Sequence, residues 1–126
     1  MADTAHRVVQ RTAGGVRYLF HERGTGAQPR AGQRVTMSYT GFLPDGRIFD
    51  ASSAQGGLLK FRVGRREVIA GLDEVTPLLP VGSRVRIWIP AALGYAAQGV
   101  RDPDDGHYIV PPDTELVFEL FVMSVR

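Results

Sequence analysis

The chain has 126 residues, of which 44% are hydrophobic and 22% charged, and its formal net charge is +2. This length and composition are those of one ordinary globular domain, with a core large enough to be stable without cross-links. The sequence contains no cysteine, which excludes disulfides, thiolate metal sites and cysteine nucleophiles.

The N-terminal segment and the charge distribution give no sign of a nucleic-acid or membrane partner. Arginines are spread along the chain rather than clustered, which disfavours nucleic acid. Residues 1–11 lack the apolar stretch of a secretory signal, and no stretch approaches 18 apolar residues. We therefore expect a cytoplasmic protein, although a trimmed secreted form would have the same sequence. Residues 1–14 are expected to be a loose leader or an extra edge strand, and residues 15–126 the folded domain.

Alternation of apolar and polar residues predicts the first strands. It runs through residues 16–21 and again through residues 35–41, where it is most regular. Residues 43–47 then combine proline, aspartate and glycine, the composition of a tight turn. We expect a hairpin whose return arm is formed by residues 48–50.

One short helix is predicted over residues 68–75. Val68, Leu72 and Val75 recur at the spacing of one helical face, and Pro77 ends the pattern. No other segment shows a comparable helical period.

Three further strands complete the predicted fold. They are expected around residues 61–63, 81–89 and 115–125, and the last is apolar on both faces, as a central strand would be. Residues 90–112 form a long irregular segment, which in a compact domain is usually functional or mobile. The predicted fold class is α+β, with an antiparallel half-barrel sheet of about five strands wrapped around one short helix.

The sequence offers no conventional catalytic constellation. His6, His21 and His107 have no metal-ligand spacing, no serine lies in a nucleophile-elbow context, and no glycine-rich loop opens a helix. We expect no metal and no cofactor. If the protein is an enzyme, its reaction must need little acid, base or nucleophile.

Several short motifs, in one order, resemble the signatures of the FKBP-type peptidyl-prolyl isomerases. The resemblance covers about residues 15–126, agrees with the predicted strands and helix, and is specific because so many matches follow in sequence. The matching segments are residues 38–41 (Ser-Tyr-Thr-Gly), 45–50 (Asp-Gly-Arg-Ile-Phe-Asp), 66–72 (Arg-Glu-Val-Ile-Ala-Gly-Leu), 81–83, 89–90, 93–95 (Leu-Gly-Tyr) and 109–118.

The resemblance implies an apolar pocket, between the helix and the sheet, that accepts a proline ring and binds macrolides of the tacrolimus and rapamycin type. The implied partners are proline-containing peptides or unfolded proteins, and we expect a monomer. Carried over residue by residue, the resemblance implies the catalytic residues Tyr39, Phe49, Asp50, Tyr95 and Phe118, and the binding residues Leu59, Glu67, Val68, Ile69, Leu72, Ile109 and Val110.

The sequence departs from the family pattern at three places. Leu72 stands where the best-known members have a tryptophan at the pocket floor. Gln55 replaces the arginine that commonly pairs with the acid, which leaves the charge partner of Asp50 open. Residues 98–108 are longer and more acidic than in minimal members, so that His107 is only a weak match for the family's loop histidine.

The expected function is acceleration of rotation about X-Pro peptide bonds during protein folding. Two alternatives of the same fold stay open at the level of sequence. One is a module that binds proline segments or macrolides with little catalysis, and the other is a folding helper that captures unfolded chains on an apolar rim.

Overall fold

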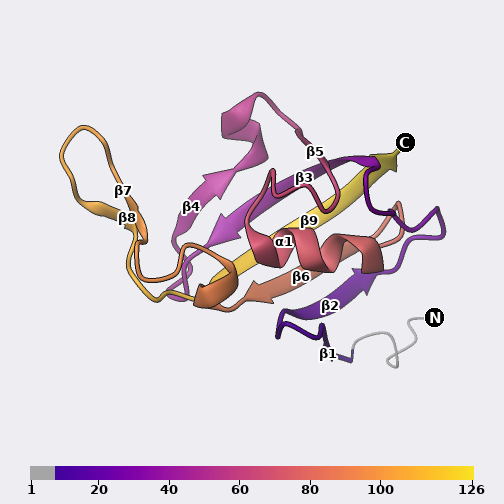
Figure 1. The fold of residues 1–126 in the computed structure, drawn as a ribbon, viewed down its shortest axis with the longest axis horizontal. Helices are drawn as coiled ribbons and strands as arrows, with labels where there is room; N and C mark the ends of the chain where they lie inside the picture. Colours follow the sequence, from indigo (N-terminus) through magenta and orange to yellow (C-terminus); the bar gives the residue numbers. More distant parts are fainter. Residues whose placement is uncertain (1–7) are drawn as a thin grey trace.

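A curved antiparallel sheet forms the body of the protein, which we describe from a computed structural model over residues 8–126, without the side chain of Gln55. The strands follow the order β1-β2-β6-β9-β3-β4, and β5 also pairs with β3 (Figure 1). All pairs are antiparallel. The bounds are β1 Gln10–Arg11, β2 Arg17–Glu22, β3 Arg34–Phe42, β4 Ile48–Ala51, β5 Leu59–Arg62, β6 Arg84–Ile89 and β9 Leu116–Val125.

The alternation in each strand decides which side chains enter the core. In β6, Val85, Ile87 and Ile89 are fully buried, whereas Arg84 and Arg86 on the opposite face are exposed. Buried and half-buried residues also alternate along most of β9. This strand lies between β6 and β3 and is therefore the central strand that the sequence predicts. The apolar residues of one face form a single core on the concave side of the sheet.

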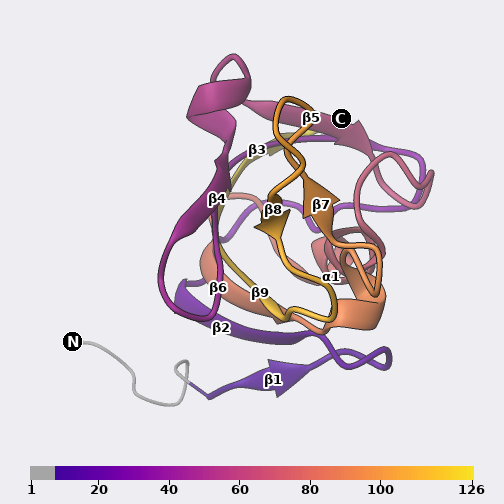
Figure 2. The same ribbon diagram turned by 90° about the vertical axis from the view of Figure 1, so that its left-hand side faces the viewer.

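Helix α1 (Ala70–Val75) lies across this concave face, and Figure 2 shows the sheet curving around it. Leu72 and Val75 are its buried side chains. Gly71 allows the close approach, because a Cβ there would lie 2.5 Å from Cγ2 of Ile89. The helix begins two residues later than the apolar spacing predicts, since Ile69 has an extended ψ of 148° and caps it. A short 3-10 helix, η3 (Thr76–Leu78), carries Pro77 and closes the segment.

The sheet has seven strands rather than about five, and the extra strands are short. β1 adds a two-residue edge to β2, while β4 and β5 pair with different parts of β3. Residues 1–7 of the predicted leader, including His6, lie outside the described residues. After β1 the chain is tied to the helix, because the Thr12 hydroxyl and the Gly14 N–H both donate to the Glu74 carboxylate.

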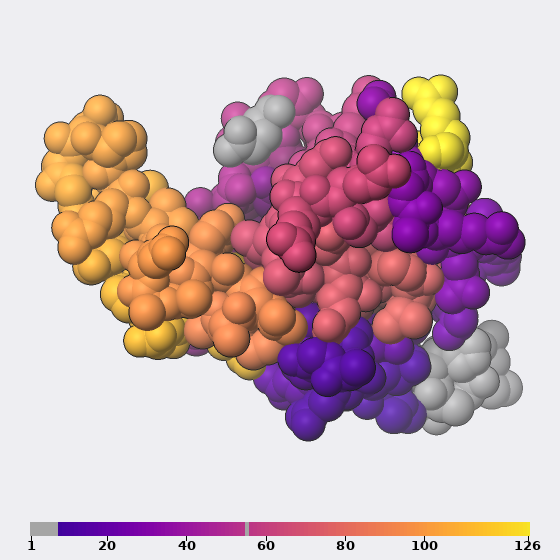
Figure 3. Space-filling model, viewed as in Figure 1, coloured from indigo at the N-terminus to yellow at the C-terminus, as the bar shows by residue number. Residues whose placement is uncertain are grey.

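The segment between β6 and β9 contains structure that the sequence analysis did not predict. It begins with a 3-10 helix, η4 (Ala91–Leu93), and continues into a hairpin of β7 (Val100–Arg101) and β8 (Tyr108–Val110). The hairpin projects from the body of the protein (Figure 3). Strands of two and three residues are too short to show an alternation in sequence. None of the helices in residues 8–126 has the length and apolar content needed to cross a bilayer.

Substitution of Gly71 by alanine is expected to destabilise the protein, although alanine normally favours a helix over glycine. The added Cβ would overlap the buried Ile89 side chain, and overpacking of this kind costs about 1–3 kcal/mol. Urea unfolding would measure the loss. A Gly71→Ala variant as stable as the parent would contradict the close helix–sheet contact.

Candidate active site

Four aromatic rings meet where the helix, β3, β4, β9 and the loop after β6 converge. Phe118 of β9 contacts Tyr39 and Phe49 edge-on, with ring centroids 5.8 and 5.6 Å apart. Phe49 also contacts Tyr95 edge-on at 6.4 Å. Edge-to-face contacts at these distances are favourable beyond the area that they bury. Three strands and one loop are therefore held in one aromatic cluster.

Gly41 makes this cluster possible. A Cβ at this position would lie 2.7 Å from Cζ of Phe49 and 2.9 Å from Cε1 of Phe118. Any larger residue at position 41 would push the rings of Phe49 and Phe118 away from β3. The glycine of the Ser-Tyr-Thr-Gly motif is thus explained by packing.

A cavity of about 120 Å³ lies between these rings and the start of α1. Ile69 has an extended ψ and residues 63–68 form turns and bends, so Val68 and Ile69 precede the helix instead of continuing its apolar stripe. Eight of the residues expected from the family resemblance line the cavity: Tyr39, Asp50, Leu59, Val68, Ile69, Leu72, Tyr95 and Phe118.

The other expected residues lie around the cavity rather than on its wall. Phe49 supports Phe118 and Tyr95 from its position on β4. Ile109 is half-buried and Val110 fully buried at the base of the β7–β8 hairpin. Glu67 is exposed, and its carboxylate accepts a hydrogen bond from the Arg62 N–H at 3.0 Å. The Glu67 carboxylate is therefore bonded to the backbone of β5 and does not line the cavity.

Hydrogen bonds from Tyr39 and Ala51, among the described residues, hold the acid of the cavity. The Tyr39 hydroxyl donates to Oδ2 of Asp50 at 2.6 Å, and the Ala51 N–H donates to Oδ1 at 2.8 Å. Two donors on separate oxygens fix the orientation of the carboxylate. Asp50 therefore presents a defined geometry at the cavity wall.

Ser52 positions this pair and was missed by the sequence analysis. It is 3% exposed, accepts from the Tyr39 N–H at 3.0 Å and donates to the Tyr39 carbonyl at 3.3 Å. These bonds join β3 to η2 (Ser52–Gln55). A serine in a polar loop carries no sequence signal for such a role.

Burial and the neighbouring acid raise the pKa values of both cavity tyrosines. For Tyr39 the first cause is partial burial and the second is its hydrogen bond to Asp50. For Tyr95 the causes are burial and the charge of Asp50. Each shift is upward from the ordinary value of 10.0. Both phenols are therefore protonated at neutral pH and remain hydrogen-bond donors.

The departures from the family pattern occupy different places. Leu72 is 4% exposed and closes the cavity on the helix side. The Gln55 side chain lies outside the described part of the structure. His107 lies on the β7–β8 hairpin, where a hydrogen bond to Asp105 raises its pKa. It does not line the cavity.

The hairpin tip also gathers potential metal ligands that the sequence analysis did not bring together. Ligand atoms of Asp102, Asp105 and His107 lie within 4.8 Å of one another, because the hairpin pairs residue 102 with residue 107. Asp105 and His107 are exposed and bond to each other. Since nothing else at the tip points to an ion, we assign no metal to it.

Comparison with known proteins places this chain in a family. The sequence pattern described as FKBP-type peptidyl-prolyl cis-trans isomerase matches residues 25–123. The chain belongs to the FKBP family. A crystal structure of a peptidyl-prolyl cis-trans isomerase from Pseudomonas syringae pv. tomato is 34% identical and superposes with a TM-score of 0.81, covering 97% of this chain and 84% of the other. The FKBP fold expected from the motifs is confirmed.

Curated FKBP relatives differ in length. FK506-binding protein 1B of Neurospora crassa is 33% identical over 119 residues, which cover 89% of this chain and 99% of the relative. The outer membrane protein MIP of Legionella longbeachae is 35% identical over 112 residues, which cover 89% of this chain but 45% of that protein. The chain spans 40–45% of three such longer relatives.

Replacement of Asp50 by asparagine is expected to lower the pKa of Tyr39, because the substitution removes the negative charge that opposes ionisation of the phenol. NMR titration of the tyrosine Cζ resonances would measure the change. Asp45→Asn, at an exposed turn, is the matched control and should leave Tyr39 unaffected.

The same pKa shift sets a pH window for stability. Unfolding returns Tyr39 to its ordinary pKa of 10.0, so its contribution to stability is intact below that pH and is lost as the pH rises further. An unchanged Tyr39 titration in Asp50→Asn would show that the acid does not act on this phenol.

Proposed function

We propose that the protein accelerates cis–trans rotation about X-Pro peptide bonds, with the proline ring bound in the cavity between α1 and the sheet. The observation that carries the proposal is the cavity itself, apolar and aromatic on most sides, with Tyr39 and Asp50 at one wall. Its volume of about 120 Å³ is well below the roughly 300–1,000 Å³ of pockets that enclose drug-sized ligands. One small apolar ring is the ligand that such a cavity fits.

The energetic demand of the reaction matches an apolar site. Rotation about the bond has a barrier of roughly 18–20 kcal/mol, because the planar amide must lose its resonance. No covalent bond breaks, and the twisted amide is less polar than the planar one. An apolar cavity therefore stabilises the twisted form more than the planar form, and this difference in binding is what accelerates a reaction.

Polar groups at the rim would fix one side of the rotating bond. The Ile69 N–H and the Tyr95 hydroxyl are the proposed donors to the carbonyl groups that flank the proline. Asp50 places a negative charge at the cavity wall, where it disfavours the negative carbonyl oxygen of the planar amide. The donors restrain one side while the other side of the bond turns.

Natural partners of the site would be proline-containing peptides and partly folded chains. Macrolides of the FK506 type would insert one ring into the same cavity and cover its rim, and the N. crassa relative is named for binding FK506. The proposed form is a monomer in the cytoplasm. Size-exclusion chromatography would test the oligomeric state. Cell fractionation would test the location, because the L. longbeachae relative is named as an outer membrane protein.

Catalysis is tested by following the cis–trans relaxation of a short X-Pro peptide after a solvent jump. Uncatalysed relaxation takes tens to hundreds of seconds. The expected result is a relaxation rate that rises in proportion to protein concentration and falls when a macrolide is added. A rate unaffected by the protein would overturn catalysis and leave the two alternatives of the same fold, the binding module and the folding helper.

Two substitutions separate the cavity from the general fold. Asp50→Asn and Phe118→Leu are each expected to lower kcat/KM by about three- to tenfold, equivalent to roughly 0.7–1.4 kcal/mol of transition-state stabilisation. Leucine is preferred at position 118, because Phe118 is 4% exposed and truncation to alanine would cost about 3–5 kcal/mol of stability.

The controls for these variants are thermal unfolding and Asp45→Asn. The latter removes an acid from the exposed turn before β4 and should keep full activity. Full activity in both Asp50→Asn and Phe118→Leu would show that the reaction does not take place in this cavity.

A further inference from the structure

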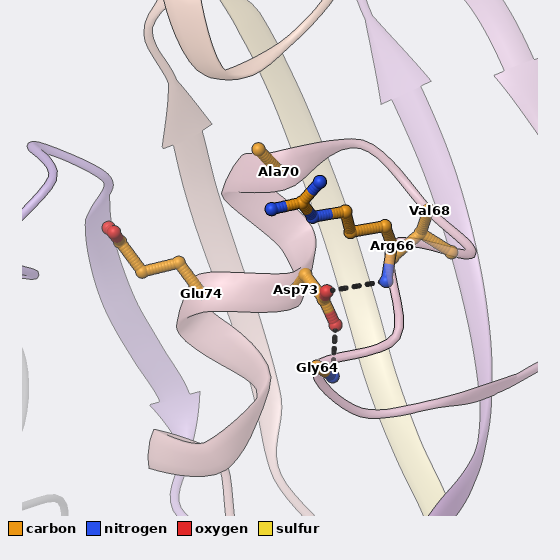
Figure 4. A pocket seen from close by; sticks show the side chains of 6 residues that line it. All are labelled: Gly64, Arg66, Val68, Ala70, Asp73 and Glu74. Carbon is orange, nitrogen blue, oxygen red and sulfur yellow. Dashed lines mark hydrogen bonds between the residues drawn. The ribbon is translucent and has the colours of Figure 1, made fainter. Parts of the chain in front are cut away.

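A second hollow lies beside the loop that leads into α1 (Figure 4). It has a volume of about 540 Å³ and is lined by Gly64, Arg66, Val68, Ala70, Asp73 and Glu74. Val68 lines both hollows. A peptide whose proline occupies the cavity can therefore continue over Val68 into this groove.

The acidic groups of the groove are already engaged within the protein. The Asp73 carboxylate accepts hydrogen bonds from the Gly64 N–H at 2.7 Å and the Arg66 N–H at 3.2 Å. Glu74 extends away from Arg66 (Figure 4), and its carboxylate accepts from the Gly14 N–H at 3.1 Å. Neither acid forms an ion pair with Arg66.

Arg66 is the cation of the groove. Its side chain runs alongside the first turn of α1 (Figure 4) and is exposed. It forms no ion pair with any other residue in the described part of the chain. An exposed guanidinium beside a substrate path can make paired hydrogen bonds to a carboxylate.

The backbone of Arg66 is held in an unfavourable conformation. Its φ of 59° is in the left-handed region, which is costly for residues with a Cβ and free of that cost for glycine. The bond from the Arg66 N–H to Asp73 fixes this conformation. Arg66, Ala96 and Asp113 are the non-glycine residues with a positive φ in the described part of the chain, and Arg66 is the one among them that lines the groove.

We propose that Arg66 is a specificity-determining residue that binds an acidic side chain of the substrate, two or three residues from the proline. The groove meets the cavity at Val68, and a bound extended peptide advances about 3.3–3.6 Å per residue, so that a residue two or three positions from the proline lies about 7–11 Å along the peptide from it. The proposal rests on the proposed isomerase function and names a substrate class for it.

The test is a series of X-Pro peptides with blocked termini, so that a side chain supplies the carboxylate. Each peptide carries Glu or Gln at one position, two or three residues before or after the proline. At one of these positions, kcat/KM for Glu is expected to exceed that for Gln by roughly 1.5- to 5-fold, the range of an exposed ion pair. The preference should weaken in 1 M salt.

Variants assign the preference to one side chain. Arg66→Gly should abolish it without lowering the melting temperature, because glycine relieves the positive φ, and Arg66→Lys should retain part of it. Arg65→Gln removes the same charge one residue away and should keep the preference. Asp113→Gly relieves a positive φ of 58° elsewhere and is the control for backbone effects.

The outcomes distinguish this proposal from the isomerase function. Equal rates for all Glu and Gln peptides, or the same preference in Arg66→Gly as in the parent, would overturn the role of Arg66 while leaving catalysis intact. Equal losses in Arg65→Gln and Arg66→Gly would replace the specific contact by a general charge effect and also overturn it. Absence of catalysis for every peptide would instead remove the proposed function.

Discussion

Packing of α1 on the concave face of the sheet is the constraint on which the rest of the structure depends. The helix has six residues, and isolated helices shorter than about 12–15 residues are marginal in water. It is therefore stable because Leu72 and Val75 are buried against the strands. Gly71 sets how closely the helix approaches, since its missing side chain leaves room for Ile89.

The cavity follows from where this helix begins. Ile69 is extended, so the loop reaches the sheet before the first helical turn. The aromatic rings of the sheet stand opposite that loop and cannot close the space completely, because they already pack edge-on against one another. What remains is a small apolar hollow with one anchored acid, Asp50. The same loop continues outward through Arg66, which places a charged groove beside the apolar cavity.

Prediction from sequence was most successful where a periodic pattern was long. The alternation over residues 35–41 and 81–89 predicted two strands, which the structure shows as β3 and β6 with their alternating apolar residues buried. The β7–β8 hairpin was missed because strands of two or three residues carry no readable period. The helix start was placed two residues too early, since Val68 and Ile69 extend the apolar stripe in sequence but not the helix in space.

The residues that line the cavity could be predicted from the sequence, but the contacts that hold them in place could not. The family motifs named eight residues that line the cavity, whereas the Glu67 carboxylate accepts a hydrogen bond from the Arg62 N–H. The bonds that hold the site depend on contacts between strands and loops, such as the two between the Ser52 hydroxyl and the backbone N–H and carbonyl of Tyr39. The strained backbone of Arg66 is likewise set by Asp73, seven residues away, which no local pattern indicates.

Binding of the proline ring in the cavity between α1 and the aromatic cluster is tested most directly by NMR on a bound X-Pro peptide. Intermolecular NOEs should connect the proline ring protons with the rings of Tyr39 and Phe118 and with the side chain of Leu72. Cis and trans peptide resonances should exchange on the same complex. NOEs from the proline ring to the outer face of the sheet instead, for example to Phe121, would contradict the account.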